Sequence, residues 1–185
     1  QVRSFVARDV SAQACRDQVV VEAAATPTQR DLDFLDPETG ADRTIRVDWN
    51  SSLTLRATKS RARPCGYWLA AGSTAAVERL RLLGLQVMRV AEPGAMLAET
   101  YRETARETGD RQDVIGTIAG GTGIVRVQVS TVRSAVDAPA GSFYVPLNQP
   151  RANLAVAALE PDTQNSYFAN RMIEDLGQMA RVMAT

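Results

Sequence analysis

The side chains that most often carry out chemistry in proteins are scarce in this sequence. It contains no histidine, which is the commonest metal ligand and the usual general base at neutral pH. Zinc sites are built from His, Cys and carboxylate ligands at short spacings, and the two cysteines, Cys15 and Cys65, stand fifty positions apart. We therefore expect no metal and no cofactor on this chain.

Two further groupings resemble parts of known sites. Lys59 beside Ser60 would be a base for a hydroxyl nucleophile, but adjacent side chains seldom meet productively. We interpret Lys59-Ser60-Arg61 as a charged connector between strands. The run AGGTG at 119–123 lacks the lysine of a P-loop and precedes a strand, which favours a hairpin turn. The acidic pairs fall on predicted solvent faces and carry no glycosidase signature; they are Glu99 with Glu103 and Glu174 with Asp175.

Charge and hydropathy narrow the possible partners. The chain has 21 Lys+Arg against 21 Asp+Glu and a net charge of zero. Arginine makes up all the basic residues except Lys59, but it is spread along the chain without a basic block, which argues against nucleic acid as a partner. No apolar run approaches the roughly 20 residues that span a bilayer. We expect a soluble protein with no membrane span.

The two cysteines leave two interpretations open. As small apolar thiols, Cys15 and Cys65 would both be buried, which is the commoner situation for cysteine. In an oxidising compartment they would form a disulfide, whose loop is worth about 4 kcal/mol in the chain-entropy account.

The elements that must position these residues begin with strands. Residues 1–17 are interpreted as a helix or linker from a preceding domain. An apolar run over 19–21 is followed by apolar residues that alternate over 32–34, 45–49 and 53–57. This pattern predicts an antiparallel first half of three or four strands. The sequence DPETG at 36–40 predicts a hairpin turn, in which Pro37 fixes φ and Gly40 supplies a positive φ.

A strand-helix-strand element is predicted over about 67–90. Its helix follows Ser73 or Thr74 and ends at Gly84, a residue typical of a left-handed C-terminal cap. Farther on we expect strands over 96–103 and 124–132, separated by a loop over 104–113, and a strand over 142–147. Helices are expected over 151–159 and over about 167–182.

The segment between Pro146 and Pro150 is predicted to have a fixed geometry. Each proline lacks a donor and fixes φ, so Pro146 belongs at a strand end or edge and Pro150 at a helix start. Asn148 and Gln149 should then cap that helix or bond neighbouring backbone. In that case, Asn148→Ala would cost about 1 kcal/mol.

Together these elements predict an α+β fold with mainly antiparallel sheet. Residues 18–185 would form one compact domain, with the strand-helix-strand element (about 67–90) and helices near the C-terminus. A size of 185 residues agrees with one ordinary domain.

Several motifs, taken together, resemble a known family. They are VDWNSSL at 47–53, RARPCGYWL at 61–69, AVERLRLLGLQV at 76–87, AGSFYVPLNQP at 140–150 and LEP at 159–161. Their order and spacing resemble the region that follows the catalytic domain in large bacterial zinc metallocarboxypeptidases, the carboxypeptidase A-like group. The resemblance covers about residues 8–171.

This resemblance implies a role without catalysis on this chain. The family's zinc ligands and catalytic glutamate precede the region, so zinc would lie in a separate catalytic domain of the same polypeptide, whose substrate is a peptide. The expected role is an accessory domain that packs on or gates that domain, in a periplasmic or secreted protein. From the motifs we take six candidate structural or interface residues: Trp49, Arg63, Tyr67, Tyr144, Asn148 and Gln149.

Two other functions stay open. A stand-alone peptide- or carbohydrate-binding module would use its aromatic residues, among them Trp49, Tyr67, Trp68 and Tyr144, although their spacing also fits core positions. An independent hydrolase is the least compatible with the residue inventory.

Overall fold

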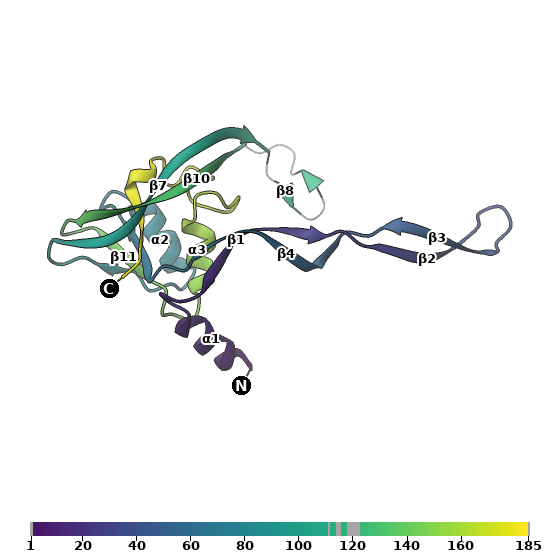
Figure 1. Cartoon of the computed structure of the whole chain (residues 1–185), viewed down its shortest axis with the longest axis horizontal. Coiled ribbons are helices and arrows are strands. Elements are labelled where there is room, and N and C mark those ends of the chain that lie inside the picture. The colour runs from purple at the N-terminus through teal and green to yellow at the C-terminus, as the bar shows by residue number, and fades with distance from the viewer. Residues whose placement is uncertain (1, 111, 114–115, 118–122, 185) are drawn as a thin grey trace.

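The computed structural model describes residues 2–110, 112–113, 116–117 and 123–184. Most of the 119–123 run therefore lies outside the described residues. The chain folds as the predicted α+β protein: a body of sheet and helices, and a long two-stranded arm that projects from it (Figure 1).

The body is built on a six-stranded sheet. Its order is β10-β7-β12-β5-β11-β6, and every neighbouring pair is antiparallel. The strands are β5 (Gly66–Leu69), β6 (Met88–Arg89), β7 (Gly94–Gly109), β10 (Ile124–Ala138), β11 (Phe143–Pro146) and β12 (Met179–Val182). The last strand therefore occupies a central position, between β7 and β5.

Two helices share one hydrophobic core with one face of this sheet. They are α2 (Thr74–Leu82) and α3 (Ala152–Leu159). Leu80 of α2 and Leu159 of α3 join Tyr67 and Leu69 of β5 in the main cluster. Trp68 points to the other face, where it packs with small residues such as Ala98 and Ala180. The alternation along β5 thus places successive side chains in two different clusters.

The predicted strand-helix-strand element is confirmed as β5, α2 and β6. Gly84 follows the helix with φ +78°, the left-handed conformation expected of a glycine cap. The second strand is shorter than predicted, at Met88–Arg89. It pairs with β11, which also pairs with β5, so β11 lies between the two strands of the element.

The predicted antiparallel first half is confirmed, with four strands. It forms two successive ribbons, the inner one of β1 (Gln18–Thr26) with β4 (Ser51–Ala62) and the outer one of β2 (Gln29–Leu35) with β3 (Asp42–Asp48). We call residues 18–62 the arm. The predicted hairpin turn is confirmed, with Gly40 at φ +69°.

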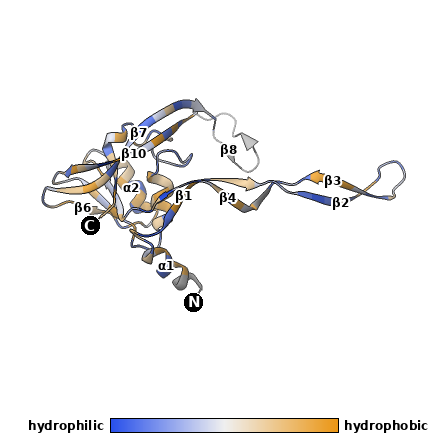
Figure 2. Ribbon diagram, in the orientation of Figure 1, coloured by the Kyte–Doolittle hydropathy of each residue, from blue (hydrophilic) through white to orange (hydrophobic). Residues whose placement is uncertain are grey.

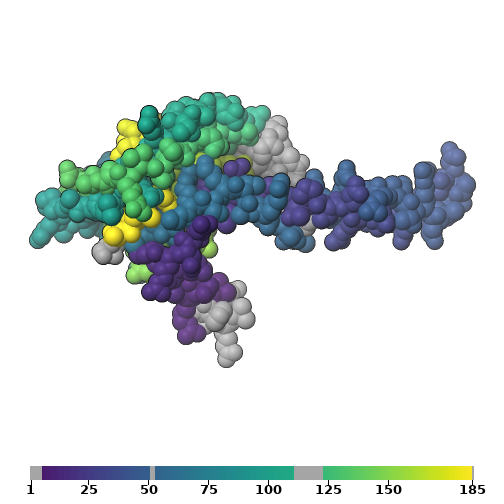
Figure 3. Space-filling view, viewed as in Figure 1, coloured from purple at the N-terminus to yellow at the C-terminus, as the bar shows by residue number. Residues whose placement is uncertain are grey.

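The outer ribbon stands clear of the body (Figure 3). Hydrophobic segments run along the arm between hydrophilic ones (Figure 2). Of the fourteen large hydrophobic side chains that are exposed among the described residues, seven lie in the arm: Val20, Phe34, Leu35, Ile45, Trp49, Leu53 and Leu55. Apolar residues at every second position therefore predict the strands of the arm correctly, but their side chains do not form a buried face.

Three predicted segments are wrong. Residues 104–109 continue β7, since they pair with β10 along its whole length. Lys59-Ser60-Arg61 lies inside β4. The helix expected over 167–182 is instead a series of turns, a short 3-10 helix (Leu176–Gln178) and strand β12. Arg171 has φ +57°, which interrupts any helix. Met179 and Val182, two of the apolar side chains at helical spacing, are buried because β12 is covered on both faces.

The N-terminal segment forms α1 (Val2–Ala12). Val10 and Ala14 pack against the main cluster, so this segment is attached to the body. No helix in the described part of the chain is both long and apolar enough to cross a membrane.

Candidate functional site

A network of buried charges lies where α3 meets the sheet. Glu160 directly follows α3 and is fully buried. Its Oε1 accepts hydrogen bonds from Tyr67 Oη at 2.8 Å and Arg181 Nε at 2.9 Å, and its Oε2 accepts one from Arg61 Nη1 at 2.8 Å. Both carboxylate oxygens are therefore occupied by groups of the chain itself.

The network continues on both sides of Glu160. Arg61 also donates to Asp162, through Nη1 at 2.8 Å, and Lys59 Nζ donates to the same carboxylate. Arg181 donates to Glu99 and to the backbone carbonyl of Ala62. Three cations and three carboxylates meet in this network: Lys59, Arg61 and Arg181 with Glu99, Glu160 and Asp162.

The electrostatics of this network fit a structural role. Burial raises the pKa of Tyr67, and the neighbouring Glu160 carboxylate raises it further, so its hydroxyl stays a donor. Burial also raises the pKa of Asp162, but hydrogen bonds from Arg61 and Lys59 outweigh it and hold that pKa below its usual value. Because each buried charge is matched by an opposite one, the network joins β4, β5, β12 and α3 without presenting a free reactive group.

A groove lies beside this network, with a volume of about 1010 Å³. One wall is residues 18–23 of β1, and another is residues 125–128 of β10. The remaining lining comes from α3, from the loop 161–165 and from Leu55, Arg63 and Glu107. In the described topology β1 pairs only with β4, and β10 only with β7. Each wall therefore offers a strand edge that no described strand occupies.

Arg63 lines the same groove and is 4 % exposed. Its Nη2 donates to Asn153 Oδ1 at 2.8 Å, and its Nη1 reaches Gln13 Oε1 at 3.5 Å. Its Nε is buried without a hydrogen-bond partner. Burial lowers the pKa of Arg63, which is the expected effect of low dielectric on a cation.

The structure separates the other predicted site residues. Tyr67 is in the charge network. Trp49 is exposed in the arm, where Arg30 lies 5.7 Å from its ring centroid. Tyr144 is half-buried, and its ring covers Gly66, where a Cβ atom would lie 2.5 Å from it.

Gln149 is buried and hydrogen-bonded to backbone, whereas Asn148 is exposed. Gln149 bonds backbone: its Oε1 accepts from Gln86 N at 2.8 Å, and its Nε2 donates to Pro146 O at 2.6 Å. Asn148 is exposed, and α3 has no side-chain cap. The predicted capping by Asn148 is therefore wrong, because the chain fixes this junction through Gln149. The stability loss expected for Asn148→Ala loses the cap on which it was based.

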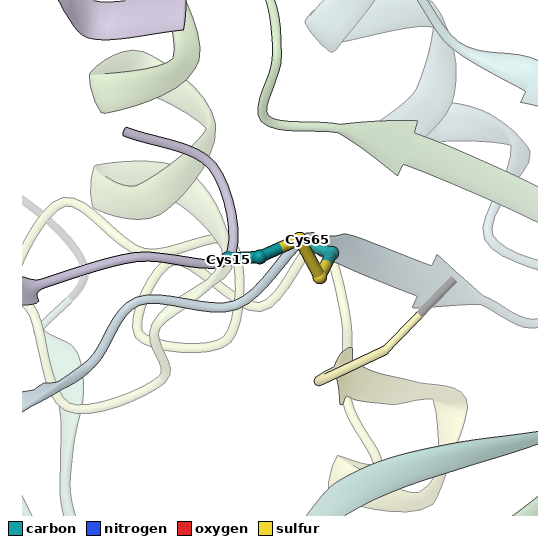
Figure 4. Close-up of a disulfide and its surroundings, with 2 residues drawn as sticks. All are labelled: Cys15 and Cys65. Atoms are coloured by element: carbon teal, nitrogen blue, oxygen red, sulfur yellow. A yellow bond between two sulfur atoms is a disulfide. The ribbon is translucent and has the colours of Figure 1, made fainter. Parts of the chain in front are cut away.

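Cys15 and Cys65 form a disulfide (Figure 4). It ties the segment after α1 to the start of β5. Of the two interpretations that the sequence left open, the structure shows the bridged one. Next to it, Cys15 N donates to Pro64 O at 3.2 Å, so the bridge adds to a backbone contact between the same segments.

Few local patterns in the sequence indicate the charge network. Arg61 and Glu160 are 99 positions apart, and no local pattern reveals such a pair. Glu160 and Asp162 flank Pro161 at the end of a helix, a pattern typical of a helix stop and not of an ion pair. The usable sign was an acidic residue directly after an apolar helix, where its side chain is near the core.

Among the described residues, no group of three or more His, Cys, Asp or Glu side chains is arranged to hold a metal ion. No protein-family model, curated protein or solved structure matched this chain.

Proposed function

We propose that this chain is an accessory domain of a zinc carboxypeptidase-like protein, which packs on or gates a catalytic domain of the same polypeptide. The catalytic domain would hold the zinc and hydrolyse C-terminal peptide bonds. The motifs at 61–69 and 140–150 that suggest this family form one unit here, since β5 and β11 pair along their whole length.

The arm is the observation that carries this proposal. Leu53 is 97 % exposed and Leu35 is 70 % exposed. A two-stranded ribbon has no core of its own and is only marginally stable in water. Apolar side chains exposed along such a ribbon suit a surface that another domain covers.

The disulfide supports a location outside the reducing cytoplasm. Structural disulfides persist in oxidising compartments such as the periplasm and the extracellular space. A periplasmic or secreted protein agrees with the Cys15–Cys65 bridge.

Two measurements test the proposal. The coding sequence that adjoins residues 1–185 should contain an in-frame HxxE motif with a later histidine. In the resulting polypeptide, amide hydrogen exchange of β2 and β3 should be slower than in the 185-residue chain alone. Equal exchange in both would contradict docking through the arm.

A binding module without catalytic activity is the second candidate, and the groove favours a peptide over a carbohydrate. Sugar rings stack on exposed aromatic side chains, whereas no aromatic residue lines the groove among the described residues. Tyr67 and Trp68 are buried, so neither offers a stacking surface.

A further inference from the structure

Arg63 is a buried cation whose only side-chain hydrogen-bond partners in the described structure are neutral. Asn153 and Gln13 accept from its guanidinium, and its Nε has no partner. No described carboxylate forms an ion pair with Arg63; the exposed Asp17 acts on it only by its charge, which raises the pKa. One donor of a buried guanidinium is thus left unused beside an open groove.

The other two arginines near the sheet centre show the contrast. Arg61 meets both Glu160 and Asp162, and Arg181 meets both Glu160 and Glu99. A buried charge without a counter-charge is costly. The planar fork of a guanidinium matches a carboxylate through two parallel hydrogen bonds. An anionic ligand in the groove would supply Arg63 with a counter-charge, which carboxylates of the chain supply to Arg61 and Arg181.

The groove itself has the form of a site for an extended chain. Its volume of about 1010 Å³ is at the upper end of the range for small-molecule pockets. Residues 18–23 of β1 line one wall, and six residues of strand extend about 20 Å. The edge of β1 that faces away from β4 presents backbone donors and acceptors, and proteins bind peptides by adding a strand to such an edge. The edge of β10 is partly occupied, because Val125 N donates to Ala169 O and Val129 O accepts from Arg61.

Arg63 lies at the inner end of this groove. It follows β4, whose last residue, Ala62, pairs with Gln18 at the start of β1. From there β1 runs outward along the groove to Ala23 and the arm. Gln13, which bonds Arg63, is not part of the groove lining. The cation therefore stands where an extended ligand would end, and this position fits a terminal carboxylate better than a side chain in mid-peptide.

We propose that the groove between β1 and β10 binds an extended peptide, whose C-terminal carboxylate accepts hydrogen bonds from the Arg63 guanidinium. This inference goes beyond the docking role, because it assigns a ligand to the 185-residue chain itself. The peptide would lie along β1 with its C-terminus at Arg63.

The test uses the 185-residue chain and three fluorescein-labelled peptides in fluorescence anisotropy at pH 7. The first is the apolar hexapeptide SVTVAL with a free carboxylate, and the second is the same peptide with a C-terminal amide. The free acid should bind at least about tenfold more tightly, since a charge-assisted pair is worth that much. Equal affinity, or no binding of either peptide at millimolar concentration, would overturn the proposal.

The third peptide, SVTVAD with a C-terminal amide, separates two sources of the carboxylate. It should bind as weakly as the amide of the first peptide. Binding as tight as that of the free acid would show that a side chain supplies the anion, which overturns the assignment to a C-terminus.

Two variants connect the effect to Arg63. Arg63→Met should bind acid and amide equally, whereas Arg102→Met, which removes an exposed arginine of β7 outside the groove, should keep the preference. A retained preference in Arg63→Met would overturn the role of this residue. If Arg63→Met does not fold, Arg63→Lys takes its place and should retain charge but lose most of the preference. Failure of the peptide to bind would not contradict the proposed docking of the arm, because hydrogen exchange tests that docking separately.

Discussion

Arg181 Nε lies 2.9 Å from Glu160 Oε1, and neither side chain is more than 1 % exposed. The pair joins the end of α3 to β12, which is the last strand in the sequence and a central strand of the sheet. Tyr67 of β5 donates to the same oxygen. Helix and sheet are thus held together by a charge pair whose partners are both buried, and each partner has a second counter-charge in the network, Glu99 for Arg181 and Arg61 for Glu160.

Replacing Glu160 should be severely destabilising. Glu160→Gln leaves three cations facing two carboxylates, and a buried ion pair that loses one partner costs about 3 to 5 kcal/mol. Urea denaturation followed by circular dichroism measures the change. Glu92→Gln removes an exposed carboxylate and should change stability by less than about 0.5 kcal/mol. Similar losses in the two variants would contradict a structural role for Glu160.

Removing the hydroxyl of Tyr67 should have a smaller effect. Tyr67→Phe leaves Glu160 one donor short in a buried site, and a hydrogen bond to a charged group is worth about 1.5 to 3 kcal/mol. The matched control is Tyr144→Phe, since no described hydrogen bond involves that hydroxyl. Both are measured as urea midpoints, and an equal midpoint shift in the two variants is the result that would count against this prediction.

Stability should fall at acidic pH because of Asp162. The pKa of Asp162 in the folded chain lies below its ordinary value of 3.8, so the unfolded chain takes up the proton first as the pH falls. The contribution of Asp162 is therefore present above about pH 4 and is lost as the pH falls through the lower, folded pKa. Urea midpoints between pH 5 and pH 2 should decline less steeply in Asp162→Asn than in the natural chain. Parallel declines would show that Asp162 is not linked to folding.

The disulfide should contribute strongly to stability. It closes a loop with a sequence separation of 50, for which the chain-entropy account gives about 4 kcal/mol. The double variant Cys15→Ala with Cys65→Ala should lose this amount in urea denaturation. Dithiothreitol should reduce the natural chain to nearly the same midpoint and leave the double variant unchanged. A loss that dithiothreitol does not reproduce would point to packing of the buried Cys65 as its cause.

The apolar side chains of the arm should matter for docking but not for folding. Leu53→Ser changes a side chain that is 97 % exposed, so the stability of the 185-residue chain should change by less than about 0.5 kcal/mol. In a polypeptide that carries the proposed catalytic domain, the same variant should restore fast hydrogen exchange in β2 and β3. Leu82→Ser, on the exposed side of α2, is the control and should leave hydrogen exchange in β2 and β3 slow. Unchanged slow exchange in Leu53→Ser would argue for a different docking surface.

The elements that the sequence predicted well are those with local signals. The hairpin at 36–40 and the end of α2 at Gly84 depend on residues that need a positive φ or fix φ, and such requirements act within a few positions. Pro146, predicted at an edge or strand end, is the last residue of β11. Gln149 bonds backbone, as a structural role for that amide implies.

The features that were not predicted depend on distant partners. Lys59 and Arg61 are typical of a loop when only their neighbours are considered, but in the structure they neutralise carboxylates about 100 positions later. The segment 167–182 has apolar residues at helical spacing. It becomes turns and a strand because the position between β7 and β5 in the sheet accommodates only an extended segment. The spacing of apolar residues along the sequence does not reveal that such a position exists.

The central position of β12 also bears on how the protein is made. While the ribosome is still synthesising the chain, β7 and β5 have emerged, but the strand that separates them has not. The body of the protein can therefore complete its sheet only after synthesis has passed Val182, and until then the facing edges of β5 and β7 lack their partner strand. Nascent chains with such exposed edges are prone to aggregate, so holding by a chaperone during translation would benefit this chain more than a protein whose strands pair in the order of their synthesis.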